Sequence, residues 1–225
     1  MTINCKGKLI DLSTPKVMGI LNLTPDSFFD GGKYKNDNEI LSQVYMMLKN
    51  KATFIDVGAY SSRPGALDIS VEEESRRLIP IIELIIKEFP EALISIDTFR
   101  SEIARRGIEA GAALINDISA GKLDNKMIPI VADLQVPYIM MHMKGTPQTM
   151  TTKTQYDNLI QDILFYFSER LAKVREYGLI DTIIDPGIGF AKNREQNFKL
   201  LNHLELFETL GRPLLIGLSR KSLIY

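Results

Sequence analysis

Acidic and amide side chains recur in this sequence at one kind of place, the polar residue that closes a short apolar run. Three of them, Asp97, Asn116 and Asp185, have the most chemistry to offer. A carboxylate accepts two parallel N–H bonds, and an amide offers both a donor and an acceptor. Brought together, the three can recognise the N–H-rich edge of a heterocycle. The alternative for each one alone is that it caps the next helix or ties down a loop.

Two loops carry further polar groups. One contains Asp26, Ser27, Phe28 and Asp30. Its Pro-Asp-Ser and Asp-Gly-Gly sequences are typical of turns, but two adjacent phenylalanines favour a lid that closes over a ligand. The other loop contains Ser62, Arg63 and Pro64. The planar fork of an arginine suits a carboxylate or phosphate, and the alternative is an exposed turn with a solvated arginine.

The glycines of segment 185–192 permit close approach of a ligand to the backbone, which is a weak phosphate signal on its own, and segment 217–222 adds cations. The pair Arg220 and Lys221 fits an anionic substrate, since loops at this position in barrels often bind phosphate. The alternative is an exposed basic turn. We expect His142 to be a buried structural imidazole. No histidine or carboxylate has the spacing of a transition-metal site, but the sequence is compatible with Mg²⁺ held by a neutral oxygen and phosphate oxygens.

Seven apolar runs place these residues, and we expect each run to form a buried parallel strand. They cover residues 17–22, 53–58, 93–97, 113–117, 136–142, 182–185 and 214–219. Apolar residues at helical spacing predict helices at 72–88, at 101–111 with Ser101 as the N-cap, and at 158–177. Alternation of strand and helix predicts βαβ units.

Polar residues are expected at the carboxyl end of all seven runs or just beyond it, namely Asn22, Asp56, Asp97, Asn116, Asp117, His142, Asp185 and Ser219. This favours a (β/α)₈ TIM barrel over a doubly wound sheet, because only a barrel brings every strand end to one mouth. We expect one barrel domain over residues 1–225. A closed barrel has eight strands, so the eighth βα unit is expected to be missing from this sequence.

Composition excludes several classes of protein. The chain has 225 residues with 27 Lys and Arg against 28 Asp and Glu, so it lacks the basic excess of a nucleic-acid binder. Cys5 is the only cysteine, which rules out an intramolecular disulfide. No apolar run approaches the roughly 20 residues of a membrane span. The first residues lack the apolar core of a secretory signal. We therefore expect a cytoplasmic protein with no nucleic-acid or membrane partner.

Taken together, the motifs resemble the dihydropteroate synthase family, from Val17 to the end of the sequence. The matching segments are Gly19-Ile-Leu-Asn-Leu-Thr-Pro-Asp-Ser-Phe, Ser62-Arg-Pro-Gly-Ala, Ser95-Ile-Asp-Thr, Ile115-Asn-Asp-Ile-Ser, Met141-His-Met, Asp185-Pro-Gly-Ile-Gly-Phe and Ser219-Arg-Lys-Ser. The resemblance implies a TIM-barrel transferase, usually a homodimer, that condenses dihydropterin pyrophosphate with p-aminobenzoate in folate biosynthesis. Sulfonamides compete for the p-aminobenzoate site in this family.

The resemblance also implies roles for individual residues. The catalytic residues would be Asp97, Asp185, Lys221 and Asn22, with Asn22 holding Mg²⁺. The pterin would bind to Asp97, Asn116, Ile118, Met141, Asp185, Phe190, Gly217 and Lys221. The p-aminobenzoate would bind to Ser62, Arg63, Pro64, Phe190 and Ser222. The loop with Asp26, Ser27, Phe28 and Asp30 would close over the reacting centre.

Some positions depart from the family pattern. Ser61-Ser62 stands where Ser-Thr is usual, and Ala191 where glycine is common. The Arg-x-His motif of the family's last strand, which helps to bind pyrophosphate, is absent from the sequence. Two other functions share the pterin-binding residues. One is a methyltransferase that binds methyltetrahydrofolate, and the other is a catalytically silent pterin-binding barrel.

Overall fold

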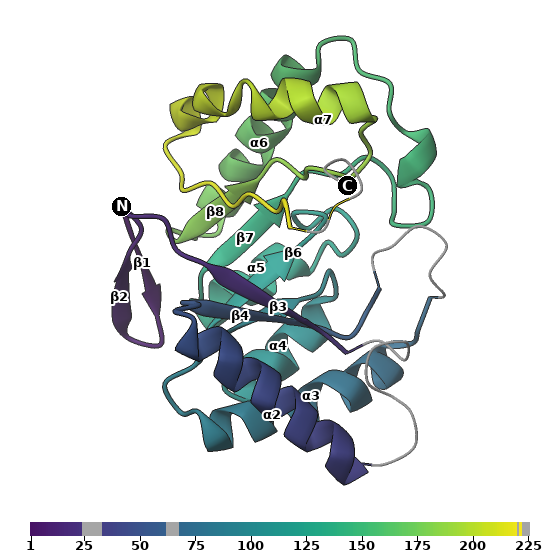
Figure 1. The fold of residues 1–225 in the computed structure, drawn as a ribbon. Coiled ribbons are helices and arrows are strands. Elements are labelled where there is room, and N and C mark those ends of the chain that lie inside the picture. The colour runs from purple at the N-terminus through teal and green to yellow at the C-terminus, as the bar shows by residue number, and fades with distance from the viewer. Residues whose placement is uncertain (24–32, 62–67, 220, 222–225) are drawn as a thin grey trace.

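Six parallel strands form the central sheet of the chain. The computed structural model describes residues 1–23, 33–61, 68–219 and 221. Within them the sheet consists of β3 (Met18–Asn22), β4 (Phe54–Gly58), β5 (Leu93–Asp97), β6 (Leu114–Asp117), β7 (Tyr138–Met141) and β8 (Thr182–Asp185). Each strand pairs with the next one along the chain, in the order β3-β4-β5-β6-β7-β8 (Figure 1). A doubly wound sheet reverses direction at a switch point. This sheet does not, and its order is that of the expected TIM barrel.

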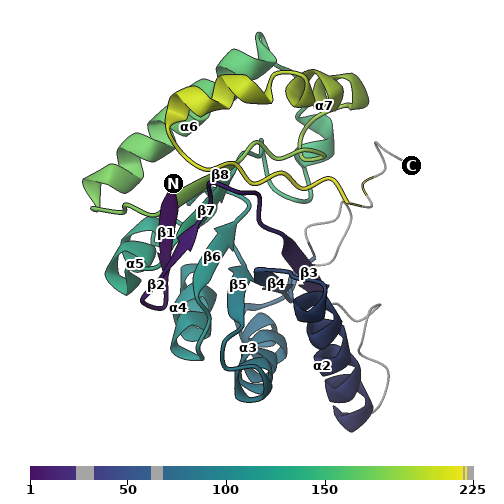
Figure 2. The same cartoon turned by 60° about the vertical axis from the view of Figure 1, so that its left-hand side comes forward.

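Helices follow the strands and cover the outer face of the sheet (Figure 2). The described helices are α2 (Lys33–Lys49), α3 (Val71–Glu88), α4 (Ser101–Glu109), α5 (Met127–Leu134), α6 (Leu159–Glu176) and α7 (Arg194–Leu201), with 3₁₀ segments η1 (Met150–Thr152) and η2 (Leu204–Leu210). The helices predicted at 72–88 and 158–177 are confirmed to within one residue at each end. None of the helices in the described part of the chain is long and apolar enough to cross a membrane.

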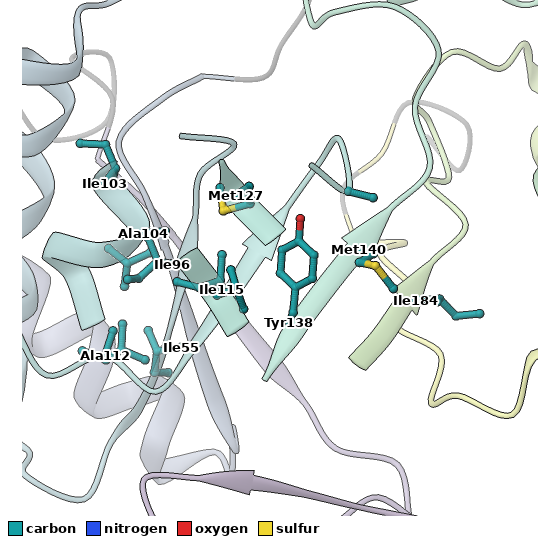
Figure 3. Packing of buried hydrophobic residues seen from close by; sticks show 14 of the residues in the cluster. Ile55, Ile96, Ile103, Ala104, Ala112, Ile115, Met127, Tyr138, Met140 and Ile184 are labelled. Atoms are coloured by element: carbon teal, nitrogen blue, oxygen red, sulfur yellow. The ribbon is translucent and has the colours of Figure 1, made fainter. Parts of the chain in front are cut away.

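The larger core lies between the sheet and the helices. Alternate strand residues face outward, because successive side chains of a strand point to opposite faces. Figure 3 shows Ile55, Ile96 and Ile115 from three successive strands, with Ile103 of α4 and Met127 of α5 in the same packed layer. Apolar burial here is what holds each helix against its strands, and it fixes which residues face inward.

A smaller core fills the inside of the sheet at the amino ends of the strands. There Phe54 and Leu93 begin β4 and β5 and pack against Ile3 and Cys5. These last two belong to an antiparallel hairpin of β1 (Thr2–Cys5) and β2 (Lys8–Asp11), which sequence analysis did not predict. The hairpin closes this end of the sheet, so the carboxyl ends of the strands lie at the opposite, polar end.

The prediction of a seventh strand at 214–219 is wrong beyond Leu214 and Leu215, where the pairing ends. Leu214 makes one parallel bridge to Ile184 of β8, with Leu215 N–H donating to Ile184 O at 2.9 Å. The next ladder bond in this register needs the N–H of residue 186. Residue 186 is proline, which has no N–H, so the pairing stops.

The predicted N-cap of the third helix is also wrong. Ser101 lies inside α4, and Arg100 occupies the cap position. The Ser101 N–H instead donates to Asp124 Oδ2 at 2.8 Å, so a residue 23 positions away satisfies this helix end. Local spacing could not predict a cap that comes from another element.

Candidate active site

Three of the predicted site residues lie in one row across the carboxyl ends of the strands. The parallel register pairs Asn22 of β3 with Gly58 of β4, Gly58 with Asp97 of β5, and Asp97 with Asn116 of β6. Residues in register on neighbouring parallel strands point to the same face. The structure therefore brings Asn22, Asp97 and Asn116 together at the polar end of the sheet, as the sequence predicts.

The Asn116 side chain is held by an aspartate below it. Asn116 Nδ2 donates to Oδ2 of Asp56 on β4 at 3.1 Å. Asp56 is buried, and that burial, together with the negative charge of Asp185, raises its pKa to about 6. The side chains of Ser95 and Asn116 act against this shift.

The Asp185 carboxylate closes β8 and shapes the loop that follows. Its Oδ1 accepts from the Gly187 N–H at 2.8 Å. Burial raises the pKa of Asp185, while this N–H and the cations of Lys221 and Lys192 act in the opposite direction. Asp185 therefore ties down the loop through Oδ1, while its role in binding a ligand stays a prediction.

Asp117, which ends β6 beside Asn116, is a structural residue. Its carboxylate accepts from Ser119 N–H, from Gly121 N–H at 2.6 Å and from the Tyr138 hydroxyl at 2.6 Å. These bonds shape the turn after β6, so the loop-tying alternative holds at this strand end.

The Lys221 side chain lies between Gly189 and Gly217. A Cβ at Gly189 would stand 3.2 Å from its Cδ, and one at Gly217 would stand 3.3 Å from its Nζ. The Nζ donates to Ile188 O and lies 5.1 Å from the centre of the Phe190 ring. Burial lowers the pKa of Lys221, and the charge of Asp185 opposes this. Because Gly217 has no side chain, it leaves room for the Lys221 side chain.

The predicted apolar contacts of the pterin also converge. Ile118 and Met141 are buried in one cluster, against which Phe190 packs. Met143 and Met150 belong to the same cluster. It lies at the strand ends beside the polar row, which gives the site one apolar wall and one polar wall.

Asp97 is the one carboxylate of this row, and its surroundings raise its pKa. Burial raises its pKa well above the ordinary aspartate range, and the negative charges of Asp56, Glu74 and Asp117 raise it further. Carboxylates that are crowded in this way favour a cationic or N–H-donating ligand, because such a ligand relieves both the repulsion and the desolvation.

Sequence reasoning missed a buried lysine behind the site. Lys192 Nζ donates to Gly187 O at 2.9 Å and to Phe190 O at 3.0 Å, and lies 3.1 Å from His142 Nδ1. Burial lowers the pKa of Lys192 to about 7 and that of His142 well below its ordinary value. His142 is thus the buried structural imidazole that the sequence predicts, with the lysine as its partner.

The fit of Mg²⁺ rests on Asn22. Its side chain is exposed at the end of β3. A neutral amide oxygen is a ligand that Mg²⁺ accepts when phosphate oxygens and water complete its shell. No group of three or more His, Cys, Asp or Glu in the described part of the chain could hold a metal on its own. Asn22 therefore fits a metal that is shared with the substrate.

Several predicted residues lie outside the described part of the structure. They are Asp26, Ser27, Phe28 and Asp30 of the first loop, Ser62, Arg63 and Pro64 of the second loop, and Ser222. Their predicted roles stay predictions.

Comparison with known proteins identifies the family. Residues 18–225 match the family model described as pterin binding enzyme. The dihydropteroate synthase of Synechocystis sp. is 45% identical over 210 residues, which cover 92% of this chain and 72% of that protein. The crystal structure of the Yersinia pestis dihydropteroate synthase with a sulfonamide drug matches with a TM-score of 0.91 at 38% identity, over 100% of this chain and 82% of that one. The Xanthomonas albilineans dihydropteroate synthase in complex with 7,8-dihydropteroate matches with a TM-score of 0.87 at 35% identity, over 100% of this chain and 80% of that one. With strand order, site geometry and sequence in agreement, the chain belongs to the pterin-binding enzyme family, among the dihydropteroate synthases.

Proposed function

We propose that the chain is an alkyl-transferring enzyme that condenses 6-hydroxymethyl-7,8-dihydropterin pyrophosphate with p-aminobenzoate, giving 7,8-dihydropteroate and pyrophosphate. The observation that carries this proposal is the convergence of Asp97, Asn116, Asp185 and Lys221 at the carboxyl ends of a barrel-ordered sheet. The related structures with a sulfonamide and with 7,8-dihydropteroate support the same reaction.

The site suits a pterin ring. Asp97 and Asp185 supply acceptors for the ring's N–H groups, and Lys221 supplies a donor for its oxygen or a ring nitrogen. Ile118, Met141 and Phe190 provide the apolar surface against which a flat ring packs. A few convergent polar groups in an apolar pocket are the usual composition of a small-molecule site.

The chemistry needs a stabilised cation. When the C–O bond of the pterin methylene breaks, its electron pair leaves with pyrophosphate, and positive charge spreads from the methylene into the ring. The nitrogen lone pair of p-aminobenzoate then forms the new C–N bond, and the nitrogen loses its extra proton to solvent. Asp97 and Asp185 are buried at the strand ends, and we propose that they lie near this charge, where preorganised carboxylates would stabilise it.

The departing pyrophosphate needs positive charge of its own. Asn22 would hold Mg²⁺ at the end of β3, and a bound Mg²⁺ supplies charge stabilisation to the phosphate oxygens. For p-aminobenzoate we propose Ser62, Arg63, Pro64 and Ser222 together with Phe190. Arg63 would face the carboxylate of that substrate.

Two broader expectations accompany the reaction. We propose that the enzyme acts in the cytoplasm and as a homodimer, as the family resemblance implies. Analytical ultracentrifugation of the purified chain tests the dimer, since a dimer sediments with twice the mass of the 25.4 kDa chain.

Product formation tests the reaction directly. The chain is mixed with dihydropterin pyrophosphate, Mg²⁺ and labelled p-aminobenzoate, and labelled dihydropteroate is separated by chromatography. We expect product that disappears when either substrate is omitted. Binding of the pterin without turnover would instead favour the silent barrel, and methyl transfer that depends on a corrinoid partner would favour the methyltransferase.

The cationic transition state has a test of its own. Deuterium at the pterin methylene should give a normal secondary isotope effect on the C–O cleavage step. An effect near unity would contradict the dissociative mechanism.

A further inference from the structure

Asp56 is a buried carboxylate that the reaction described above does not use. It lies in the middle of β4, in register with Ser95 of β5, one layer below Gly58 and Asp97. It is 6% exposed. Its Oδ2 accepts the bond from Asn116 Nδ2, whereas Oδ1 makes no well-formed hydrogen bond among the described residues. The Ser95 side chain in register with it lies near enough to lower its pKa, but not in hydrogen-bond geometry. Within the same part of the chain, no lysine or arginine forms an ion pair with it.

Such a carboxylate does not serve stability. A buried acceptor left without a partner costs about 1–3 kcal/mol, and more when it is charged. A buried charge without a counter-ion is among the most expensive groups in a protein. An apolar side chain or an asparagine at position 56 would fold at lower cost. The position of Asp56 beneath the site, in contact with Asn116, points to the benefit that offsets this cost.

The contact decides which way the Asn116 amide faces. A side-chain amide has a donor branch and an acceptor branch on opposite sides. An ionised carboxylate only accepts, so the amide must turn its NH₂ branch toward Asp56. Oδ1 of Asn116 is then the branch turned away from Asp56. In that orientation the residue offers an acceptor, like its neighbour Asp97, and matches a ligand edge that consists of N–H donors.

We propose that Asp56 is a positioning residue for pterin binding, which fixes the Asn116 amide so that Oδ1 is presented to an N–H group of the substrate. The proposal rests on the function proposed above and deepens it. Asp56 would not touch the substrate itself, but it would help the site to select a ring with N–H donors at the matching positions. Asp56 thus acts on specificity through Asn116 alone.

The first test changes the charge and keeps the shape. In Asp56→Asn the new amide can offer either branch to Asn116, so the Asn116 amide loses its single orientation. We expect the KM and Kd for dihydropterin pyrophosphate to rise about tenfold, the loss of roughly one well-made hydrogen bond to a charged group. The KM for p-aminobenzoate should stay within about twofold. Thr182→Val, which removes a buried hydroxyl from β8 without touching Asp56, is the matched control, and both constants should stay within about twofold in it.

A double variant that exchanges the side chains at positions 56 and 116 tests whether amide orientation, and not merely a negative charge, is needed. In Asp56→Asn with Asn116→Asp, the new amide at position 56 donates to the new carboxylate at position 116. The other oxygen of that carboxylate again presents an acceptor to the pterin. We expect the swapped pair to bind dihydropterin pyrophosphate at least about threefold more tightly than either single variant, because only the pair restores the donor–acceptor match.

Three results would overturn the proposal. They are a pterin Kd in Asp56→Asn within twofold of the unchanged chain, equal rises in the KM of both substrates, and a swapped pair no better than its singles. Urea unfolding accompanies each variant, and we expect Asp56→Asn to be at least as stable as the unchanged chain. If that variant does not fold, Asp56→Ser replaces it with the same expected loss. Turnover by the unchanged chain is measured first, so a failure of the proposed function is seen separately.

Discussion

The carboxylate of Asp97 lies directly against the bare backbone of Gly58. The two residues are in register on β5 and β4, and a Cβ at Gly58 would stand 3.1 Å from both Cβ and Oδ2 of Asp97. That is closer than side chains ordinarily pack, so any residue larger than glycine pushes the carboxylate out of its place. The glycine at the end of β4 therefore belongs to the site, although it carries no functional group.

Gly58→Ala should consequently damage catalysis more than stability. We expect kcat/KM for dihydropterin pyrophosphate to fall about tenfold, since a displacement below 1 Å at a reacting centre carries a cost of this order. Steady-state kinetics with the pterin as the varied substrate measures it. Gly19→Ala is the control, because the added Cβ meets the flexible Met47 side chain and not a site residue. Unchanged kinetics in Gly58→Ala would mean that Asp97 does not contact the substrate.

The fold was predictable to the extent that burial imposed a local pattern. The apolar runs mark all six strands because most of these strands are buried on both faces, although β3 is partly exposed. Two features carried no such signal. The β1–β2 hairpin is four residues per strand, with only Ile3 and Cys5 buried in the smaller core. The end of pairing beyond Leu215 depends on a proline in another segment of the chain.

Lys192 anchors the loop that carries Asp185 and Phe190, so removing its amine should loosen both. Lys192→Met leaves Gly187 O and Phe190 O without their donor and removes the amine beside His142 Nδ1. We expect a loss of about 2–4 kcal/mol in the free energy of unfolding, since buried acceptors are left unpaired. Measured at a temperature where it is folded, the variant should show a KM for the pterin raised about tenfold. The exposed Lys199→Met on α7 is the matched control and should change neither quantity.

The candidate site was predicted less completely than the fold, for a physical reason. Asp97, Asn116 and Asp185 end apolar runs and are visible as breaks in a pattern. The expected place of Asp56 at a strand end is wrong, because Asp56 lies in the middle of β4. Its role there depends on the partner it meets two strands away in the sheet, here Asn116, 60 residues along the chain. Contacts between distant strands leave no mark in the spacing of either segment.

Asp56 should make the protein less stable as the pH rises. Its pKa in the folded chain is raised to about 6 from an ordinary 3.8, so the folded state binds more protons than the unfolded state between these values. The free energy of unfolding then falls as the pH rises. The penalty is absent below about pH 4 and complete above about pH 6. Asp56→Asn removes it, so its stability relative to the unchanged chain should increase across this window by an amount on the order of 1–3 kcal/mol.

Urea unfolding at pH 4, 5, 6 and 8 measures this difference. Asp11 provides a contrast, because a backbone hydrogen bond from Ser13 lowers its pKa. Asp11→Asn should therefore lose stability relative to the unchanged chain as the pH rises, a trend of opposite sign. A pH-independent difference for Asp56→Asn would show that its carboxylate titrates alike in the folded and unfolded states.

At Gly107 of α4, glycine should be more stable than alanine, which is the reverse of the usual order in a helix. Replacing a glycine in the middle of a helix by alanine ordinarily stabilises it by about 0.5–1 kcal/mol, because alanine loses less backbone entropy on folding. In α4, however, an added Cβ at Gly107 would stand 2.2 Å from Cδ1 of Ile96 and 3.4 Å from Cδ1 of Ile82. Both isoleucines are fully buried in the core between the sheet and the helices, so neither can turn toward solvent. The helix must move outward, and we expect Gly107→Ala to destabilise the chain by about 1–3 kcal/mol.

Urea unfolding at pH 7 measures this change in the free energy of unfolding. Gly107→Ala with Ile96→Val removes the clashing methyl and should recover part of the loss. A stabilised Gly107→Ala would mean that α4 sits further from the sheet than the structure places it.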